Sequence, residues 1–474
     1  MKERFHAIDA LRVFAMVSVV FLHSSISYMP TRLPDLLWAV HDPSATAFFD
    51  WLFFWIRGLT MRVFFLVAGF FAGVLYEDRG PKAFLENRLR RIAIPFLVGS
   101  GVLLPLLYFI WCYGWLETGR ADLSQVLRMR LDAPIQRNLY GPAHLWFLEF
   151  LVLFYAVYYA FRRVRPGFVR PGGVVEKIIF SRLRPLALAV PSMLILWLDV
   201  DVVINFHNTF IPNPLKFLYY GFFFLAGTWL YPFRERLKNL AAGANAYLAA
   251  SLPVFIGMVA LTRAHIAKPL AGPGYFALVA ATSLFAWLSV FAMLGYFMRF
   301  LNREIPLVRY LSGASYWIYL CHLPVVGLMQ VFLLRFELPA ALKFSAVVLT
   351  ALGSGFLTYE VFVRNTSIGL CLSGPKHFGG MPPRPLTLKV KTTLTAFMLC
   401  AVVLSGTSFQ HFYNEEKKRY EGTLAGFYRQ YLHREPDAVG WRHWTDWALN
   451  RWGLEKVERI GFIEAGRKEG KERA

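Results

Sequence analysis

The stretch ALRVFAMVSVVFLHSSISY, residues 10–28, decides how this chain folds. A helix needs about 20 mostly apolar residues to cross the hydrocarbon core of a bilayer, and this stretch meets that need. Its polar residues Arg12 and His23, and its continuation to Tyr28, favour a retained membrane helix over a cleaved signal peptide. The first segment therefore predicts a membrane protein.

Apolar stretches of similar length recur along the chain. Hydrophobic residues make up 56% of the 474 residues and charged residues 17%, whereas soluble domains are about a quarter charged. Further spans are expected at roughly 51–76, 92–113, 144–161, 185–199, 215–231, 247–261, 275–298, 314–334, 341–361 and 392–408. The sequence thus predicts an all-α polytopic membrane protein with about eleven transmembrane helices.

The formal net charge of +21 raises the question of nucleic-acid binding. The basic residues, however, lie between the apolar segments, as in 77–91 and 162–184. This distribution is typical of the positive-inside rule and of contact with anionic lipid headgroups, so membrane lipids and no nucleic acid are expected as partners. It also places the N-terminus in the cytoplasm, and an odd number of spans places the C-terminal tail on the opposite side.

The composition divides the chain into four parts. Residues 1–365 are expected to form a core of about ten helices, 366–391 a Pro/Gly-rich cytoplasmic linker, 392–408 an extra span and 409–474 a polar helical module. Within that module, FYRQYLHREPDAVGWRHW (427–444) resembles a small helical module called domain of unknown function 4214, which implies an extracytoplasmic appendage that touches glycans. The alternative is a basic amphipathic tail on the membrane surface.

Ionisable residues inside the first span are costly and therefore point to function. Arg12 and His23 are eleven residues apart, which places them on nearly the same helix face with a rise of roughly 16 Å between them. Asp9, three residues before Arg12, can pair with it and hold its orientation. The alternatives are a snorkelling arginine and a histidine that only hydrogen-bonds between helices.

A second basic pair precedes the third predicted span. Arg88 and Arg91 are three residues apart and share a helix face. Arginine binds phosphate through two parallel hydrogen bonds, so the pair suits a phosphate-bearing ligand at the cytoplasmic edge. The alternative is an ordinary positive flank of a membrane helix.

Five segments in the same order resemble acyltransferase family 3, a family of membrane proteins, over about 360 residues. They are Arg12 to His23, Arg88 to Arg91, FFLVAGFF (64–71, with Ala68 in place of the usual serine), HLWFL (144–148) and SYWIYLCHLP (315–324). The resemblance implies a bacterial inner-membrane O-acyltransferase with an acyl-CoA donor in the cytoplasm and a glycan acceptor in the periplasm or at the cell surface. Within the family, the stretches 61–76, 89–95 and 144–148 most resemble the glucan biosynthesis protein C branch, which implies succinylation of periplasmic glucans.

The resemblance also implies roles for individual residues. Arg12, Arg88 and Arg91 would hold the phosphates of acyl-CoA, either succinyl-CoA or acetyl-CoA, with Asp9 orienting Arg12. His23 would be the general base on the acceptor hydroxyl or, alternatively, a transient acyl carrier.

Secondary candidates for the acceptor or the acyl group are His144, Glu149, His322, Arg57 and Arg62. Arg57 or Arg62 could pair with Glu149 or with the carboxylate of a succinyl group. Arg62 and Glu149 depart from the pattern expected of relatives. Neither the four cysteines nor the histidines show metal-ligand spacing, so no metal and no permanently bound cofactor are expected.

Two other functions remain open from the sequence. A multi-pass transporter or flippase of a glycan, a lipid or a small acid would also carry buried charges, but it more often shows repeated halves, and none is visible here. A non-catalytic scaffold with a glycan-binding tail would leave the pair Arg12 and His23 without a role.

Overall fold

The computed structural model describes residues 5–128, 131–165, 173–206, 208–364, 366, 368–369, 372, 414, 417–448 and 457–463. These residues form helices and loops, and no strand occurs among them. The expected all-α class is confirmed. The predicted span 392–408 and nearly all of the predicted linker 366–391 lie outside the described residues.

The helices follow one another along the chain with short connections, and short 3-10 or π segments are labelled η. The first part contains α1 (His6–Ser25), η1 (Ile26–Tyr28), α2 (Ala47–Arg88), η2 (Leu89–Ala93), α3 (Ile94–Glu117), α4 (Leu123–Leu127), α5 (Ala133–Leu139), η3 (Ala143–Leu145), α6 (Trp146–Val164), α7 (Gly173–Phe180), α8 (Arg184–Leu198) and α9 (Asp201–Ile204). The second part contains α10 (Pro214–Leu230), η4 (Tyr231–Ala241), α11 (Ala244–Ala267), α12 (Gly272–Phe300), α13 (Pro306–Leu333), α14 (Ala340–Thr358), η5 (Tyr359–Val363), a helix over 417–432, α17 (Ala438–Trp447) and η8 (Glu458–Ile463).

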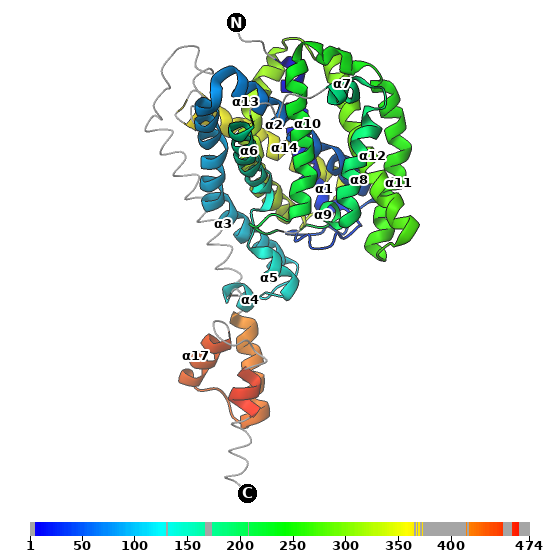
Figure 1. The fold of residues 1–474 in the computed structure, drawn as a ribbon. Coiled ribbons are helices and arrows are strands. Elements are labelled where there is room, and N and C mark those ends of the chain that lie inside the picture. The colour runs from blue at the N-terminus through cyan, green and yellow to red at the C-terminus, as the bar shows by residue number, and fades with distance from the viewer. Residues whose placement is uncertain are drawn as a thin grey trace. The chain divides into compact units, whose positions relative to one another are not determined.

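The chain forms two compact units, one made of 1–107 with 140–387 and the other of 108–139 with 388–474. In the first unit the long helices lie side by side as a bundle (Figure 1). In the second unit, the described tail helices pack around Tyr420, Leu424, Tyr428 and Phe462. The predicted helical character of this tail agrees with its described residues, whereas its side of the membrane stays a prediction.

Each of the predicted spans between residues 10 and 361 coincides with one of the helices from α1 to α14. Among the described residues, seven helical segments are long and apolar enough to cross a membrane, or eight if the bent pair α7 and α8 is one span. One of the seven covers both α2 and α3. The protein is therefore a polytopic membrane protein, and the exact number of crossings stays a prediction.

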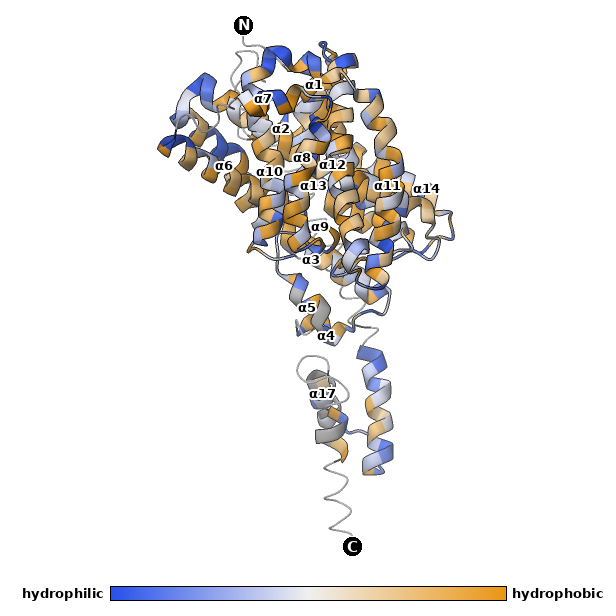
Figure 2. Ribbon diagram, turned by 45° about the vertical axis from the view of Figure 1, so that its right-hand side comes forward, coloured by the Kyte–Doolittle hydropathy of each residue, from blue (hydrophilic) through white to orange (hydrophobic). Residues whose placement is uncertain are grey.

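The polar residues of the first unit concentrate at the ends of its helices. Figure 2 shows apolar residues along the helix bodies and hydrophilic residues gathered at the end of the bundle where α1 begins. There Arg162 lies 2.5 Å from Glu77, and Arg184 donates to the carbonyl of Leu240 at 2.8 Å. The first contact joins α2 to the last turn of α6, and the second joins the start of α8 to η4, which connects α10 to α11.

Two glycines allow α2 and α10 to touch through their backbones. A Cβ on Gly69 would lie 1.9 Å from the carbonyl oxygen of Phe224, and one on Gly227 would lie 1.9 Å from that of Leu66. Small residues at membrane helix contacts permit this close approach. The glycine of the FFLVAGFF segment therefore has a packing role.

Helix α2 continues well beyond its predicted span of 51–76. It bends at Gly80, whose φ of 81° suits glycine, and Pro81 then starts the next helical turn. The hydrophilic stretch expected as a loop is thus helical to Arg88 and joins α3 through η2. Arg88 and Arg91 consequently lie on helical backbone, which is the condition for the expected position of both on one helix face.

Candidate active site

Three histidines from separate parts of the chain meet inside the first unit. His23 comes from α1, His144 from η3 and His322 from α13. Nδ1 of His23 lies 2.8 Å from Nε2 of His322, and these two rings are stacked with centroids 5.1 Å apart. The ring of His144 stands at 88° to that of His322, with centroids 5.4 Å apart. The structure therefore joins the main catalytic candidate to two secondary ones.

The hydrogen bonds determine which nitrogen of His23 carries its proton. Nδ1 of His322 lies 2.8 Å from the carbonyl oxygen of Tyr319, which can only accept, so this nitrogen is the donor. In an uncharged ring, Nε2 of His322 then accepts from Nδ1 of His23. His23, which is half-buried, is left with a lone pair on Nε2. A free imidazole lone pair can accept a proton or attack an acyl group.

A tryptophan and a glutamine that the sequence analysis missed support His23. The ring of Trp38 stacks on His23 with centroids 5.9 Å apart, and its Nε1 donates to Oε1 of Gln330 at 2.8 Å. Nε2 of Gln330 in turn donates to the carbonyl of Ser24 at 3.0 Å. Gln330 could have been noticed as a polar residue inside the span 314–334, whereas nothing in the sequence marked Trp38.

Trp38 lies in the loop 29–46, which follows η1. The loop is attached to α14 by an ion pair between Lys343 and Asp42 at 2.6 Å. The backbone N–H of Asp42 also donates to the carbonyl of Ser27 at 2.8 Å. These contacts place the loop beside the end of α1 that carries His23.

Arg12 lies at the other end of α1 and contacts both predicted and unpredicted partners. Its Nη2 is 3.6 Å from Asp9, which is the ion pair expected from their spacing. It also donates to the carbonyl of Ser312 at 3.1 Å and to the Ser312 hydroxyl. The Arg12 side chain remains 38% exposed, so part of it can be reached by a ligand.

Arg88 and Arg91, the basic pair before α3, have different neighbours from Arg12. Arg88 donates to the carbonyl of Phe71 at 3.1 Å and lies over the ring of Tyr155 at 4.4 Å. Arg91 is half-buried on η2. The contacts of Arg88 join it to α2 and α6, whereas those of Arg12 join it to α1 and α13. A common seat for the CoA phosphates therefore stays a prediction.

Arg57 and Arg62 hold helices together. Nη2 of Arg57 donates to the last carbonyls of α9, those of Val203 and Ile204, at 2.8 Å each. Arg62 donates through Nε to the hydroxyl of Tyr219 at 3.2 Å and through Nη1 to the carbonyl of Arg57. Nη1 of Arg57 is buried and has no hydrogen-bond partner among the described residues.

Glu149 has a neighbour that the sequence analysis did not single out. It is 8% exposed, and its electrostatic neighbour is Lys216 of α10. Lys216 lies over the ring of Trp146 at 4.6 Å and also interacts with Arg57. The signal that could have revealed it is a lysine one residue inside the span 215–231.

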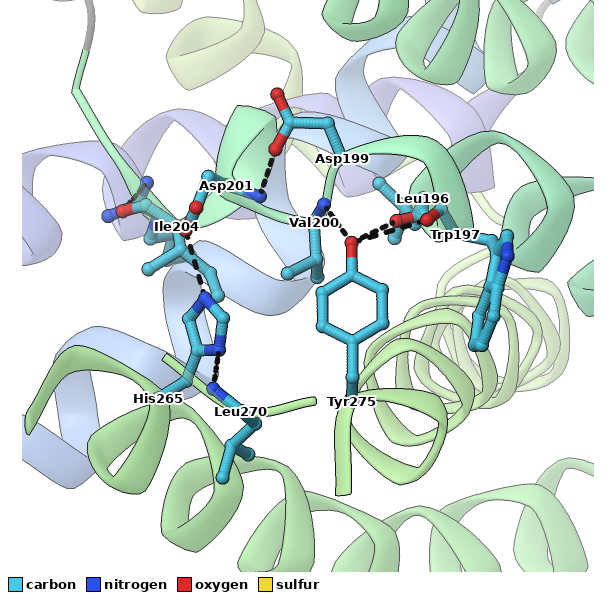
Figure 3. Close-up of polar contacts among 10 residues, drawn as sticks. Leu196, Trp197, Asp199, Val200, Asp201, Ile204, His265, Leu270 and Tyr275 are labelled. Carbon is cyan, nitrogen blue, oxygen red and sulfur yellow. Dashed lines mark hydrogen bonds and ion pairs between the residues drawn. The ribbon is translucent and has the colours of Figure 1, made fainter. Parts of the chain in front are cut away.

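The loop between α8 and α10 is fixed at several points. Figure 3 shows His265 between Asp201, at 3.3 Å, and the backbone N–H of Leu270, at 3.0 Å. Beside it, the hydroxyl of Tyr275 accepts from the N–H of Val200 at 3.0 Å and donates to the carbonyl of Leu196 at 3.2 Å. Short α9 is thus anchored to α11 and α12 at its start and to Arg57 at its end.

The same loop reaches η3. Oδ1 of Asn208 accepts from the backbone N–H of Ala143, the residue before His144, at 2.8 Å. Gly141 passes so close to Asn208 that an added Cβ would lie 2.3 Å from the Asn208 carbonyl oxygen. Within the part of the chain that the structure describes, no group of three or more His, Cys, Asp or Glu residues is arranged to hold a metal ion.

Comparison with known proteins identifies the class of this helical membrane protein. Residues 5–360 match the model of acyltransferase family 3, described as an acyltransferase domain, so the chain belongs to this family and is a membrane acyltransferase. Family membership confirms the expected enzyme class, and the transporter alternative is set aside.

Particular relatives carry one name. Glucans biosynthesis protein C of Escherichia coli K12 is 22% identical over 397 residues, covering 78% of this chain and 95% of that protein. The protein of the same name from Escherichia coli O139:H28, strain E24377A, is 20% identical over 395 residues with the same coverage. No solved structure matches the chain. The resemblance of the tail to domain of unknown function 4214 stays a prediction.

Proposed function

We propose that this acyltransferase moves an acyl group from cytoplasmic acyl-CoA to a hydroxyl of a periplasmic or cell-surface glycan, in a bacterial inner membrane. The observation that carries the proposal is the lone pair on Nε2 of His23, which the contact with His322 leaves available. Arg12 lies on the same helix at the basic end of the bundle, so one helix bears both a phosphate-binding group and a base. The N-terminus is cytoplasmic in this proposal, because the basic helix ends follow the positive-inside rule.

In the proposed reaction, Nε2 of His23 accepts the proton of the acceptor hydroxyl. The oxygen attacks the thioester carbonyl, the C–S bond breaks, and CoA leaves with the proton as a thiol. Nε2 of His322 accepts a hydrogen bond from Nδ1 of His23 and so stabilises the charged ring that forms in between. In the alternative two-step route, the same Nε2 carries the acyl group before the hydroxyl attacks.

The acyl group of the proposal is succinyl rather than acetyl. Arg57 interacts with two other cations, Arg62 and Lys216, and Lys216 also interacts with the acid Glu149. Arg62 donates to Tyr219, whereas the buried Nη1 of Arg57 has no hydrogen-bond partner among the described residues and could pair, together with Lys216, with a further anion. A carboxylate on the acyl group would supply that anion. This support for succinyl comes from the charge balance around Lys216 and Arg57.

The proposal is tested on glycans from cells that make the wild-type protein or the His23→Ala variant, after equal membrane levels have been checked. Mass spectrometry is expected to show an acyl increment on surface or periplasmic glycans that disappears in the variant, and its mass would name the acyl group. His6→Ala, on the first turn of the same helix, serves as the control and should leave the increment in place. Unchanged acylation in the His23 variant would overturn the proposal.

A further inference from the structure

The carbonyl oxygen of Leu320 has lost its usual helical donor. Proline has no backbone N–H, and Pro324 lies four residues after Leu320 inside α13. Nε2 of His144 lies 3.0 Å from this carbonyl oxygen and is therefore its donor. The hydroxyl of Tyr319 also donates to the carbonyl oxygen of His144 at 2.6 Å. Residues of α13 next to Pro324 thus hold both the ring and the backbone of His144.

This hydrogen bond determines the proton position on His144. Because Nε2 donates to a carbonyl, an uncharged ring has its lone pair on Nδ1. His144 is 5% exposed, and Nδ1 is buried without a hydrogen-bond partner among the described residues. Buried acceptors are nearly always paired in folded proteins, and exceptions concentrate where a ligand or water completes the set.

The unpaired nitrogen belongs to a ring that stands next to the site of proton transfer. The rings of His23 and His144 both pack against the ring of His322, at centroid distances of 5.1 and 5.4 Å. Each of the two outer rings has one lone pair that His322 does not use. A ligand that approaches His23 with one hydroxyl can therefore meet His144 with another.

We propose that Nδ1 of His144 accepts a hydrogen bond from a second hydroxyl of the acceptor, adjacent to the hydroxyl that is acylated. The assignment rests on the proposed acyl transfer to a glycan and names the chemistry of the acceptor: a neighbouring pair of hydroxyls, as sugars carry. One hydroxyl donates its proton to Nε2 of His23 and the other only donates a hydrogen bond to His144. His144 is thus a binding residue that orients the acceptor.

Two substitutions separate this role from a packing role. The amide nitrogen of His144→Gln falls near the position of Nε2, so it keeps the donor to Leu320 and removes the acceptor at Nδ1. The amide of His144→Asn falls near Nδ1, so its oxygen can accept there while the donor to Leu320 is lost. A role in substrate binding predicts that Asn is the better replacement, and a role limited to holding α13 predicts that Gln is.

The experiment uses the full chain in lipid nanodiscs with succinyl-CoA or acetyl-CoA and a short glucan oligosaccharide, and measures thiol release. The Gln variant is expected to raise the KM for the oligosaccharide about tenfold, as loss of one hydrogen bond would, while the Asn variant stays closer to the wild type. An unchanged KM in both variants, or a KM lower in Gln than in Asn, would overturn the assignment.

A second measurement needs no variant. Wild-type protein is given glucosides in which a hydroxyl next to the acylated one has been removed, and the KM is expected to rise by the same factor. An equal KM for intact and deoxy acceptors would contradict the role of His144. Absence of thiol release by the wild type with every oligosaccharide and both donors would instead count against the proposed function.

Discussion

The ammonium group of Lys343 lies 2.6 Å from the carboxylate of Asp42, and both side chains are only 2% exposed. Removing one partner of a buried ion pair leaves an uncompensated charge and costs about 3–5 kcal/mol. Lys343→Met is therefore expected to lower the free energy of unfolding and to release the loop that carries Trp38. The melting temperature in detergent and the amount of glycan acylation in cells would both decrease.

The control for this prediction is an exposed ion pair. Arg309 and Glu304 lie 3.0 Å apart with side chains 62% and 56% exposed, and such pairs contribute roughly 0–1 kcal/mol. Arg309→Met should leave the melting temperature nearly unchanged. Equal melting temperatures for both methionine variants would show that the Asp42 pair does not anchor the loop.

Replacement of His322 should affect the rate more than binding. In His322→Gln, the amide oxygen can still accept from Nδ1 of His23, whereas His322→Leu cannot. The Leu variant is expected to lose roughly 100-fold or more in kcat, with the Gln variant in between, because the base loses the group that orients it. Steady-state kinetics over a range of pH would check this order, and equal loss in both variants would indicate a role in packing alone.

The segment from Arg88 to Arg91 offers a matched test of donor binding. Arg91→Gln is expected to raise the KM for acyl-CoA several-fold, since one charge-assisted bond to phosphate is lost. Arg90, its exposed neighbour, is the control, and Arg90→Gln should have little effect. The difference between the two variants should shrink when the donor lacks the 3′-phosphate, and an effect of Arg90 equal to that of Arg91 would point to general surface charge.

Acyl selectivity should depend on Lys216 more than on Arg62. Lys216→Met is expected to reduce transfer of succinyl relative to acetyl by about tenfold, because an open cation is removed. Arg62→Leu breaks the bond to Tyr219 between α2 and α10 and should mainly lower thermal stability. Competition between the two CoA thioesters would measure the ratio, and the same ratio in wild type and Lys216→Met would exclude a carboxylate site there.

Local sequence patterns predicted much of this protein, since hydrophobic length and helical spacing are local properties. The spacing of Asp9 and Arg12 predicted their ion pair, and the apolar stretches predicted the helices of the bundle. The extension of α2 past Gly80 was missed, because a charged stretch with glycine and proline was taken as a loop although Pro81 can begin a helical turn.

Contacts between distant segments could not be predicted in the same way. His23 and His322 touch only because α1 packs on α13, and no local pattern relates residues 299 positions apart. Arg57 and Arg62 were considered for ligand binding, yet their contacts with α9 and Tyr219 depend on how the loop and α10 pack. Lys216 became a candidate binding residue only through its neighbours on other helices.

The chain of contacts from Tyr319 through His322 to His23 also has a consequence for charge movement. When Nε2 of His23 gains a proton, the proton on Nδ1 can pass along the hydrogen bond to Nε2 of His322, since the two nitrogen atoms are 2.8 Å apart, and the positive charge moves with it. The ring that receives it is held by a backbone carbonyl and cannot rotate away without losing that bond. The site can thus hold the positive charge one ring away from the reacting oxygen, and reversal of the transfer lets Nε2 of His23 give its proton to the departing sulfur.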